Sequence, residues 1–181
     1  MGSVRRANGG RSGRIAYALW DSPLGRLLIA ATTKGLCALR FGEDGALVQE
    51  LHAELPHAML LHDPPAVAPY IQAVLDYLAG HETRLDLPLD VQATAFQQRV
   101  WAALRQIPYG QTRSYREVAQ MIGAPGAVRA VAQACATNPV ALVVPCHRVL
   151  RSNGALSGYR WGVERKRALL ERERAFAGRP H

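Results

Sequence analysis

The 181-residue chain has few cysteines, no long apolar run and only two lysines. Its three cysteines are too few for a disulfide framework, and no Cys-x-x-Cys pair suggests structural zinc. No stretch approaches the ~18 consecutive apolar residues of a membrane-spanning helix, and the first residues contain no apolar signal core. We therefore expect a reduced, cytoplasmic protein that has no membrane segment and binds no metal.

The remaining composition is that of a globular protein, with 49% hydrophobic and 20% charged residues. These values argue against a disordered, collagen-like or coiled-coil chain. The charge is unevenly distributed. Residues 15–94 contain 4 Lys+Arg and 10 Asp+Glu, residues 95–181 contain 14 and 4, and residues 1–14 add four arginines. A basic half of this kind is typical of a protein that binds a polyanion, although a solvated basic surface would have the same composition.

The first half of the chain predicts a small α/β domain over residues 14–92, preceded by a flexible tail at 1–13 rich in Gly, Ser and Arg. Short apolar runs separated by turn signals predict an antiparallel meander of about three strands, followed by two helices. The expected strands are Arg14–Trp20, Arg26–Ala31 and Leu36–Phe41, and the expected helices are Leu47–Glu54 and Val67–Leu78.

The second half predicts a mainly helical domain over residues 93–175. Capping boxes at Thr94-x-x-Gln97 and Ser114-x-x-Glu117 begin two of its helices. The second of these is separated by a Gly-Ala-Pro-Gly break from a helix over 127–137, and this pair forms a helix-turn-helix candidate. A buried strand is expected at Val140–Val144, a last helix at Val163–Arg174, and a tail at 176–181. The predicted fold class is therefore α+β, with a small antiparallel sheet first and the helix-turn-helix second.

The helix over 127–137 consists mostly of small side chains and has one long basic residue, Arg129, near its start. Small side chains let a helix approach another surface closely, either inside the core or on DNA. An arginine is costly to bury without a partner. If this helix meets DNA, Arg129 is the side chain that enters the duplex.

Cys146 lies between Pro145 and His147, with Arg148 next. A free thiol, with a pKa near ~8.5, is mostly protonated at neutral pH, so a reactive cysteine needs a base or a positive field. His147 and Arg148 can supply either one, although a buried structural cysteine is the commoner role of this residue type. Adjacent side chains of an extended segment point to opposite faces, so we expect a water relay or a local bend between thiol and imidazole. A third group that orients the imidazole is expected among three acidic residues of the last helix, Glu164, Glu171 and Glu173.

The run Pro145-Cys146-His147-Arg148-Val149 resembles the active-site signature of the O6-alkylguanine-DNA alkyltransferases. Further segments fall in the order of that family across residues 93–175, and residues 14–92 resemble its variable N-terminal α/β domain. These segments are Phe96–Trp101, Ile107–Gly110, Ser114-Tyr115, Ala127–Val131, Asn138, Ser157–Gly162 and the stretch from Lys166 to Glu173. The bacterial Ada and Ogt types are the most similar.

The resemblance implies direct reversal of DNA damage, in which Cys146 irreversibly accepts the alkyl group of O6-alkylguanine, with O4-alkylthymine as a second candidate substrate. It implies that His147 is the base acting through water and that Glu173 orients it. Tyr115 then protonates guanine N3 and helps to rotate the nucleotide, and Asn138 is a hydrogen-bonding hinge. The implied partner is double-stranded DNA, bound through its minor groove with the damaged base flipped out. The protein is expected to act as a monomer that is consumed in one turnover without a cofactor.

The family also implies roles for residues that contact the substrate. Arg129 resembles the finger that fills the vacated base stack. Tyr159 and the Val149 backbone resemble the walls of the guanine pocket. Residues at positions where the family contacts the DNA strand are Gln97, Arg116 and Ser152.

Two other functional hypotheses remain open. A non-catalytic lesion-sensing protein could share the fold, although relatives that have lost catalysis replace the acceptor cysteine, which is present here. A cysteine hydrolase could use Cys146 and His147 as a dyad, although no oxyanion-loop motif accompanies them. The sequence contains no four-cysteine zinc segment of the kind found in Ada-type regulators, so an activator role is unsupported unless the Arg/Gly tail is the stub of a longer protein. Cys37 and Cys135 are expected to be core thiols.

Overall fold

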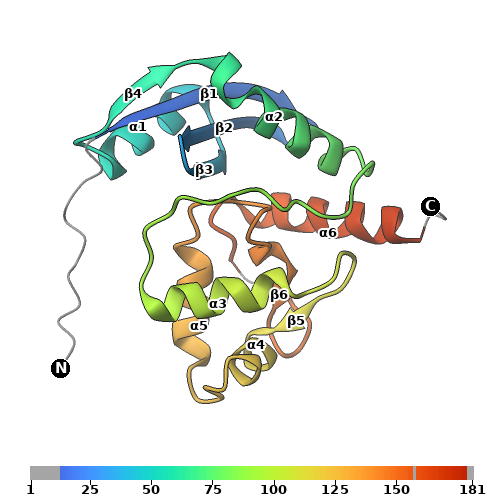
Figure 1. Cartoon of the computed structure of the whole chain (residues 1–181). Helices are drawn as coiled ribbons and strands as arrows, with labels where there is room; N and C mark the ends of the chain where they lie inside the picture. Colours follow the sequence, from blue (N-terminus) through green and yellow to red (C-terminus); the bar gives the residue numbers. More distant parts are fainter. Residues whose placement is uncertain (1–12, 157, 179–181) are drawn as a thin grey trace, which may run out of the picture.

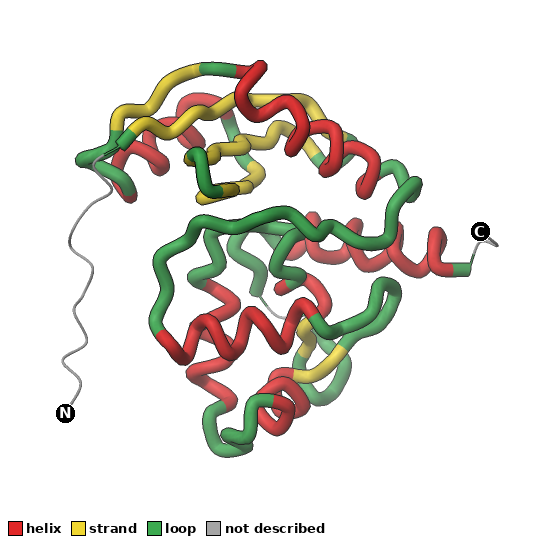
Figure 2. Tube along the Cα trace, in the orientation of Figure 1, coloured by secondary structure: helices red, strands yellow, loops and turns green. Residues whose placement is uncertain are grey.

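The computed structural model describes residues 13–156 and 158–178, in which a four-stranded sheet with two helices is joined to a mainly helical half (Figure 1, Figure 2). Strands β1 (Arg14–Ser22), β2 (Gly25–Thr32) and β3 (Gly35–Phe41) form the predicted antiparallel meander. Helices α1 (Asp44–Glu54) and α2 (Pro64–Leu78) each begin three residues before their predicted starts. For α2 the reason is local, because Asp63 caps the helix and prolines occupy its first turn.

A fourth strand, β4 (Met59–His62), was not predicted and corrects the sheet from antiparallel to mixed. It pairs in parallel with β1, which gives the strand order β3-β2-β1-β4. No residue of β4 is fully buried, so its sequence lacks the alternation of buried and exposed positions that marks a strand. Its pairing depends instead on the crossover through α1.

The two faces of the sheet are covered differently. One face packs Ile15, Leu28 and Ala38 against Leu47 and Leu51 of α1. The other face packs against α2 and continues without interruption into the core of the C-terminal half. The two halves of the chain therefore share one core.

The C-terminal half contains α3 (Ala95–Arg105), β5 (Arg113–Ser114), α4 (Tyr115–Met121), α5 (Val128–Ala136), a 3₁₀ turn at Cys146–Arg148, β6 (Val149–Leu150) and α6 (Val163–Ala177). Both predicted capping boxes are confirmed at the starts of α3 and α4. Helix α6 continues three residues past its predicted end, so residues 176 and 177 are helical and do not belong to the expected tail. Residues 1–12 and 179–181 of the expected tails lie outside the described part of the chain.

The outer edge of β3 is fastened to the C-terminal half by backbone hydrogen bonds. Leu36 pairs with the connection between α2 and α3, which runs between the sheet and the helices (Figure 1). Leu39 donates to Pro139 O at 3.0 Å and accepts from Ala141 N at 2.9 Å. These bonds cover a strand edge that would otherwise expose unpaired amides. They also tie the sheet to the segment that leads directly into Cys146.

The strand predicted at Val140–Val144 is wrong. Only Val140 forms a β-bridge, to Leu39, and the following residues form a turn in which Leu142 adopts a φ of 70°. The segment is fully buried, as its apolar sequence indicates. A short apolar run shows burial but cannot distinguish a strand from a buried turn.

No helix in the described residues is long and apolar enough to cross a membrane.

Candidate active site

Cys146, His147 and Arg148 form a single 3₁₀ turn, which Arg148 N closes by donating to Pro145 O at 3.0 Å. The extended geometry expected here is therefore wrong, and the expected local bend is present. Successive side chains of a 3₁₀ turn are rotated by about 120° rather than 180°. Cys146 and Arg148 accordingly line two different cavities, and His147 is fully buried.

The cavity at Cys146 has a volume of about 510 Å³, within the usual range for small-molecule sites. The structure brings four predicted residues together in its wall: Tyr115 from α4, Arg129 from α5, Cys146 itself and Tyr159. The hydroxyl of Tyr159 is buried and has no hydrogen-bond partner among the described residues, so it is available to a substrate. The rest of the wall is formed by Val128, Ala132, Cys135, Ala136, Arg151, Gly158 and Arg160.

Cys146 is only 4% exposed, and its thiol is held by Asn138. The side-chain amide of Asn138 donates to Sγ at 3.2 Å and to Val144 O at 2.9 Å, while its carbonyl accepts from Val140 N. Burial raises the pKa of Cys146 well above its ordinary value, and the neighbouring thiol of Cys135 adds to this rise, whereas the Asn138 hydrogen bond opposes it. The resting sulfur is therefore a thiol, and it needs a base to become a nucleophile.

His147 and Glu173 form the pair that can supply this base. Their Nε2 and Oε1 atoms are 2.7 Å apart, and both side chains are buried. Burial alone would raise the pKa of Glu173, but the charges and hydrogen bonds of His147 and Arg148 hold it well below its ordinary value. A carboxylate only accepts hydrogen bonds, so the proton of neutral His147 is on Nε2 and the lone pair is on Nδ1. Nδ1 has no hydrogen-bond partner in the described part of the chain, which leaves it free to accept a proton.

The structure selects Glu173 from the three carboxylates expected near the imidazole. Glu164 is exposed, and so is Glu171. Glu173 lies on the buried face of α6, in register with Lys166, Leu169 and Leu170. The spacing of three and four residues along this helix is the sequence signal that distinguishes it.

Glu173 accepts hydrogen bonds from other groups besides His147. Its oxygens also accept from the Tyr77 hydroxyl at 2.7 Å, from the Arg148 guanidinium at 2.9 to 3.1 Å and from Gly110 N at 3.3 Å. Gly110 has a φ of 82°, and a Cβ there would lie 2.8 Å from the Ala177 side chain. Glycine is thus needed for the Gly110 loop to approach α6 closely enough for its N–H to reach the carboxylate.

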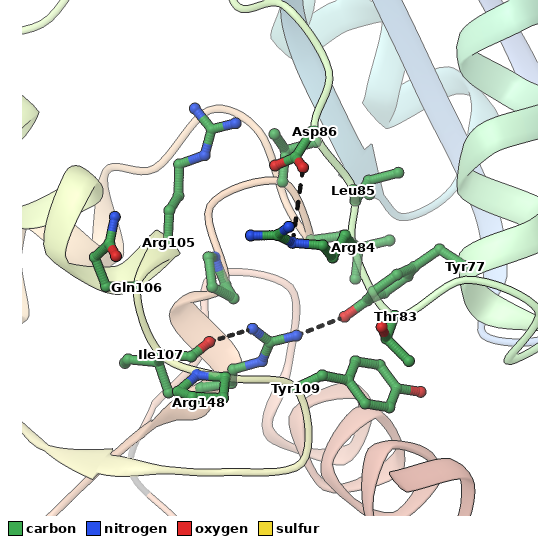
Figure 3. A pocket seen from close by; sticks show the side chains of 14 residues that line it. Tyr77, Thr83, Arg84, Leu85, Asp86, Arg105, Gln106, Ile107, Tyr109 and Arg148 are labelled. Atoms are coloured by element: carbon green, nitrogen blue, oxygen red, sulfur yellow. Dashed lines mark hydrogen bonds and ion pairs between the residues drawn. The ribbon is translucent and has the colours of Figure 1, made fainter. Parts of the chain in front are cut away.

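Arg148 neutralises the carboxylate and does not contact the sulfur. Its guanidinium also donates to Ile107 O at 2.7 Å and to the Tyr77 hydroxyl at 3.0 Å, beside a cavity of about 360 Å³ (Figure 3). The sequence makes Arg148 a candidate source of the positive field that would activate the thiol. The structure assigns it instead to the orientation of Glu173.

The buried pair makes the fold sensitive to acid. Burial lowers the pKa of His147 below its ordinary 6.5, so in mild acid the unfolded chain binds a proton that the folded chain does not. Glu173 has a folded pKa below its ordinary 4.5, so its contribution is complete above that pH and is lost as the pH falls further. Both effects have the same sign. We expect the free energy of unfolding, measured in urea, to fall as the pH is lowered from 6.5 to 4.5.

The His147→Asn variant should lose most of this dependence between pH 6.5 and 4.5, whereas His81→Asn, at an exposed position, should keep it. A wild-type stability that is constant across this range would contradict the assignment of a buried neutral imidazole.

Sequence reasoning missed Lys166. Its side chain is fully buried on α6, and Nζ lies 5.9 Å from the centre of the Tyr115 ring without a hydrogen-bond partner in the described residues. Burial lowers the pKa of Lys166, while the thiols of Cys135 and Cys146 oppose that change. The charge of Lys166 in turn lowers the pKa of Cys146. The available signal was a lysine on the apolar face of a helix, in a chain with only two lysines.

Replacing Lys166 with methionine should stabilise the protein and slow the alkylation of Cys146. An apolar side chain of similar length removes a buried charge for which the described residues provide no hydrogen-bond partner, and an unpaired buried charge is costly. The same change removes the field that favours the thiolate. Chemical denaturation and the rate of Cys146 alkylation by iodoacetamide measure the two effects. Arg167→Met, on the exposed face of α6, is the control. Faster alkylation in Lys166→Met would contradict this role.

Of the six residues that the resemblance assigns to contact with the base or the DNA strand, four do not line the Cys146 cavity. Arg116 on α4 and Ser152 after β6 are exposed. The Gln97 side chain completes its capping box and donates to Thr137 Oγ1 at 3.0 Å. Val149 is buried in β6, where it pairs with Arg113. The predicted burial of Cys37 and Cys135 is confirmed, and Cys135 also lines the cavity.

Comparison with known proteins decides the family. The model for the "6-O-methylguanine DNA methyltransferase, DNA binding domain" matches residues 95–175, and the model for the "ribonuclease-like domain" of the same family matches residues 15–91. The chain belongs to the 6-O-methylguanine DNA methyltransferase family. The resemblance noted from the sequence and the predicted α+β fold class are thereby confirmed. We refer to the two matched segments as the N-terminal and C-terminal domains.

Individual members of the family are similar over most of the chain. The protein "Bifunctional transcriptional activator/DNA repair enzyme Ada" of Escherichia coli is 50% identical over 92% of this chain, which covers 47% of that protein. The "Methylated-DNA--protein-cysteine methyltransferase" of Mycobacterium tuberculosis is 46% identical over 90% of this chain and 94% of its own. The crystal structure of Mycobacterium tuberculosis OGT in complex with DNA has a TM-score of 0.77 at 45% identity, covering 89% of this chain and 94% of that one. The chain thus spans about half the length of the Ada relative and nearly all of the other two.

Proposed function

We propose that this protein repairs DNA by transferring the alkyl group of O6-alkylguanine to Sγ of Cys146, once per molecule. The observation that carries this proposal is a protonated, buried thiol in the wall of a cavity, one residue from a neutral imidazole whose Nε2–H is held by the Glu173 carboxylate. The family supports it, because the similar mycobacterial protein is named a methylated-DNA–protein-cysteine methyltransferase.

In the proposed reaction the thiol proton passes through water to Nδ1 of His147, and Glu173 stabilises the resulting imidazolium. Sγ attacks the alkyl carbon in line with the C–O6 bond. As the S–C bond forms, the C–O6 bond breaks and its electron pair stays on guanine. Tyr115 donates a proton to guanine N3, and the proton on His147 balances the one that Tyr115 gives up. The products are unmodified guanine and a thioether, which is too poor a leaving group to regenerate the enzyme.

The proposed substrate is double-stranded DNA, bound through its minor groove with the damaged nucleotide turned into the Cys146 cavity. The groove is only ~6 Å wide, which suits the small side chains of α5. Arg129 is exposed on α5 at the cavity wall, where it can fill the gap left in the base stack. Extruding a base costs a few kcal/mol, and least for a damaged base. Gln97, Arg116 and Ser152 are the proposed contacts to the DNA strand, and Tyr159, in the cavity wall, is proposed to bind the guanine.

Several finer points are part of the same proposal. Asn138 acts as the hinge that presents the thiol, and O4-alkylthymine is a second candidate substrate. The proposed active form is a monomer. A thiol acceptor must stay reduced, which favours the cytoplasm.

The proposal is tested by counting repaired bases. A fixed amount of protein is incubated with an excess of duplex that contains O6-methylguanine, and restored guanines are counted over time. We expect a single phase that stops at one guanine per protein, and none for Cys146→Ala. The similar family member solved in complex with DNA supports DNA as the probe.

The same count separates the two rival functions. Tight binding to the lesion without restored guanine would favour a sensor and overturn the proposal. Continued turnover of a carboxylic ester by Cys146, without guanine repair, would favour a hydrolase and overturn it as well.

A further inference from the structure

A continuous set of hydrogen bonds joins the N-terminal domain to the acceptor thiol. Glu54, the last residue of α1, accepts from Arg160 Nη2 at 2.7 Å. Arg160 Nη1 donates to the backbone oxygen of Asn138 at 2.8 Å. The amide of Asn138 donates to Sγ of Cys146 at 3.2 Å. Three bonds therefore separate a carboxylate of the N-terminal domain from the nucleophile.

Glu54 is fixed from its other side by Arg40 of β3. Arg40 is only 1% exposed, and its Nη2 donates to Glu54 Oε2 at 2.8 Å. Burial would raise the pKa of Glu54, but the hydrogen bond and charge of Arg40, together with Arg160, keep it below its ordinary value. Each carboxylate oxygen thus has its own arginine, one from each domain. This arrangement restricts the carboxylate to one position.

The location of Glu54 is not explained by the stability of α1. A negative charge at the C-terminal end of a helix is unfavourable, because the helix dipole is negative there. The compensating contacts are the two arginines. One of them, Arg160, reaches across the domain boundary and lines the Cys146 cavity.

The backbone around Asn138 is tied to the same strand as Arg40. Leu39 of β3 donates to Pro139 O and accepts from Ala141 N, so Asn138 is flanked on its C-terminal side by the β3 edge. Arg160 is the side chain that holds the Asn138 carbonyl itself. If this hold is lost, the backbone of Asn138 is less restricted, and the amide that donates to Sγ is positioned only by its side-chain bonds to Val144 O and Val140 N.

We propose that Glu54 and Arg160 are positioning residues of the reaction: Glu54 fixes Arg160, and Arg160 fixes Asn138 so that its amide donates to the acceptor sulfur. This inference rests on the proposed function for its biological meaning. It gives the N-terminal domain a part in the reaction, because Arg40 and Glu54 of that domain hold Arg160 in place.

The test measures the reactivity of Cys146 without DNA. Each variant is treated with iodoacetamide across a range of pH, and the rate at the Cys146 peptide is followed by mass spectrometry. We expect Glu54→Gln and Arg160→Met to react about five-fold more slowly at neutral pH. The midpoint of their pH–rate profiles should move upward, because the hydrogen bond that favours the thiolate is weakened. Arg160→Lys, which keeps a donor and a charge, should recover most of the rate.

The double variant Glu54→Gln with Arg160→Met decides whether the two residues act in sequence. If Glu54 acts only through Arg160, the double variant is no slower than Arg160→Met alone. The control is Arg172→Met, which removes another contact between the domains, to Leu78 O, but does not touch Asn138. Its profile should match the wild type. The groups whose charges interact with Cys146, namely Cys135, Tyr159 and Lys166, are unchanged in every variant. Of the three arginines in the cavity wall, Arg129 and Arg151 are also unchanged, and Arg160→Lys keeps the charge of the third.

Unchanged pH profiles in both single variants would overturn the inference, as would losses that add in the double variant with an unmoved midpoint. Glu54→Gln leaves Arg40 buried beside a weaker partner and can lower stability; Arg160→Met keeps the Arg40–Glu54 pair and tests the same step. Methyl transfer from lesion DNA to the wild-type protein is measured in parallel. Its absence contradicts the proposed function alone, because the iodoacetamide profiles report the positioning of the thiol independently.

Discussion

We expect the Glu173→Gln variant to transfer methyl groups to Cys146 at least about 100-fold more slowly than the wild-type protein, while its affinity for lesion DNA stays nearly the same. Glutamine preserves the shape of the side chain but removes the charge that stabilises the imidazolium of His147. The carboxylate of Glu173 accepts only, so it fixes the His147 proton on Nε2 and leaves Nδ1 available as the base. A glutamine amide can also donate, so it no longer fixes the proton there. Glu173 does not line the Cys146 cavity, so DNA binding should be spared.

The variant will also be less stable, because Arg148 loses its buried counter-charge, a loss of about 3–5 kcal/mol in comparable pairs. The rate is therefore measured below the unfolding transition, with DNA binding as the evidence that the variant is folded. Glu171→Gln, on the exposed face of the same helix, is the matched control and should react like the wild type. A normal rate in folded Glu173→Gln would remove Glu173 from the proton relay.

The second large effect is expected at Arg129. Arg129→Ala should slow repair of duplex DNA by roughly 10- to 100-fold, since filling the vacated base stack offsets a cost of a few kcal/mol. It should change the reaction of Cys146 with the free base O6-methylguanine much less, because a free base needs no extrusion. The ratio of the two rates is the measurement.

Arg174→Ala is the control for charge, because it removes an exposed arginine from α6, outside the cavity wall. It should lower both rates little and equally at moderate salt. Equal losses on duplex and free base in Arg129→Ala would show that Arg129 supports the fold or the cavity instead of replacing the base.

The elements that sequence predicted well are those with local signals. Both capping boxes, at Thr94 and Ser114, mark helix starts in the structure, because each motif satisfies backbone N–H groups within a few residues. The β1–β3 meander was visible for the same reason, since its turns are short. The strand expected at Val140–Val144 is absent. The segment is apolar because distant residues bury it, and its backbone forms a turn instead of a ladder of strand hydrogen bonds.

The site divides in the same way. Cys146 and His147 are neighbours in sequence, so a joint role could be predicted from the sequence. Glu173 was one of three candidates, and only its place on the buried face of α6 selects it. Tyr77, which donates to Glu173 across 96 residues, and Glu54, which pairs with Arg160 across 106, had no local signal. Contacts of this range depend on how the sheet, the domain connection and α6 pack together.

In the proposed reaction one particular sulfur receives the alkyl group, and following the methyl carbon itself tests this step. Duplex DNA with an isotopically labelled methyl on guanine O6 is mixed with an equal amount of protein, and the label is located after digestion. We expect the whole label to be found on Sγ of Cys146 and guanine to be restored in the DNA. Label on Cys135, which lines the same cavity, or release of the label as methanol would contradict it.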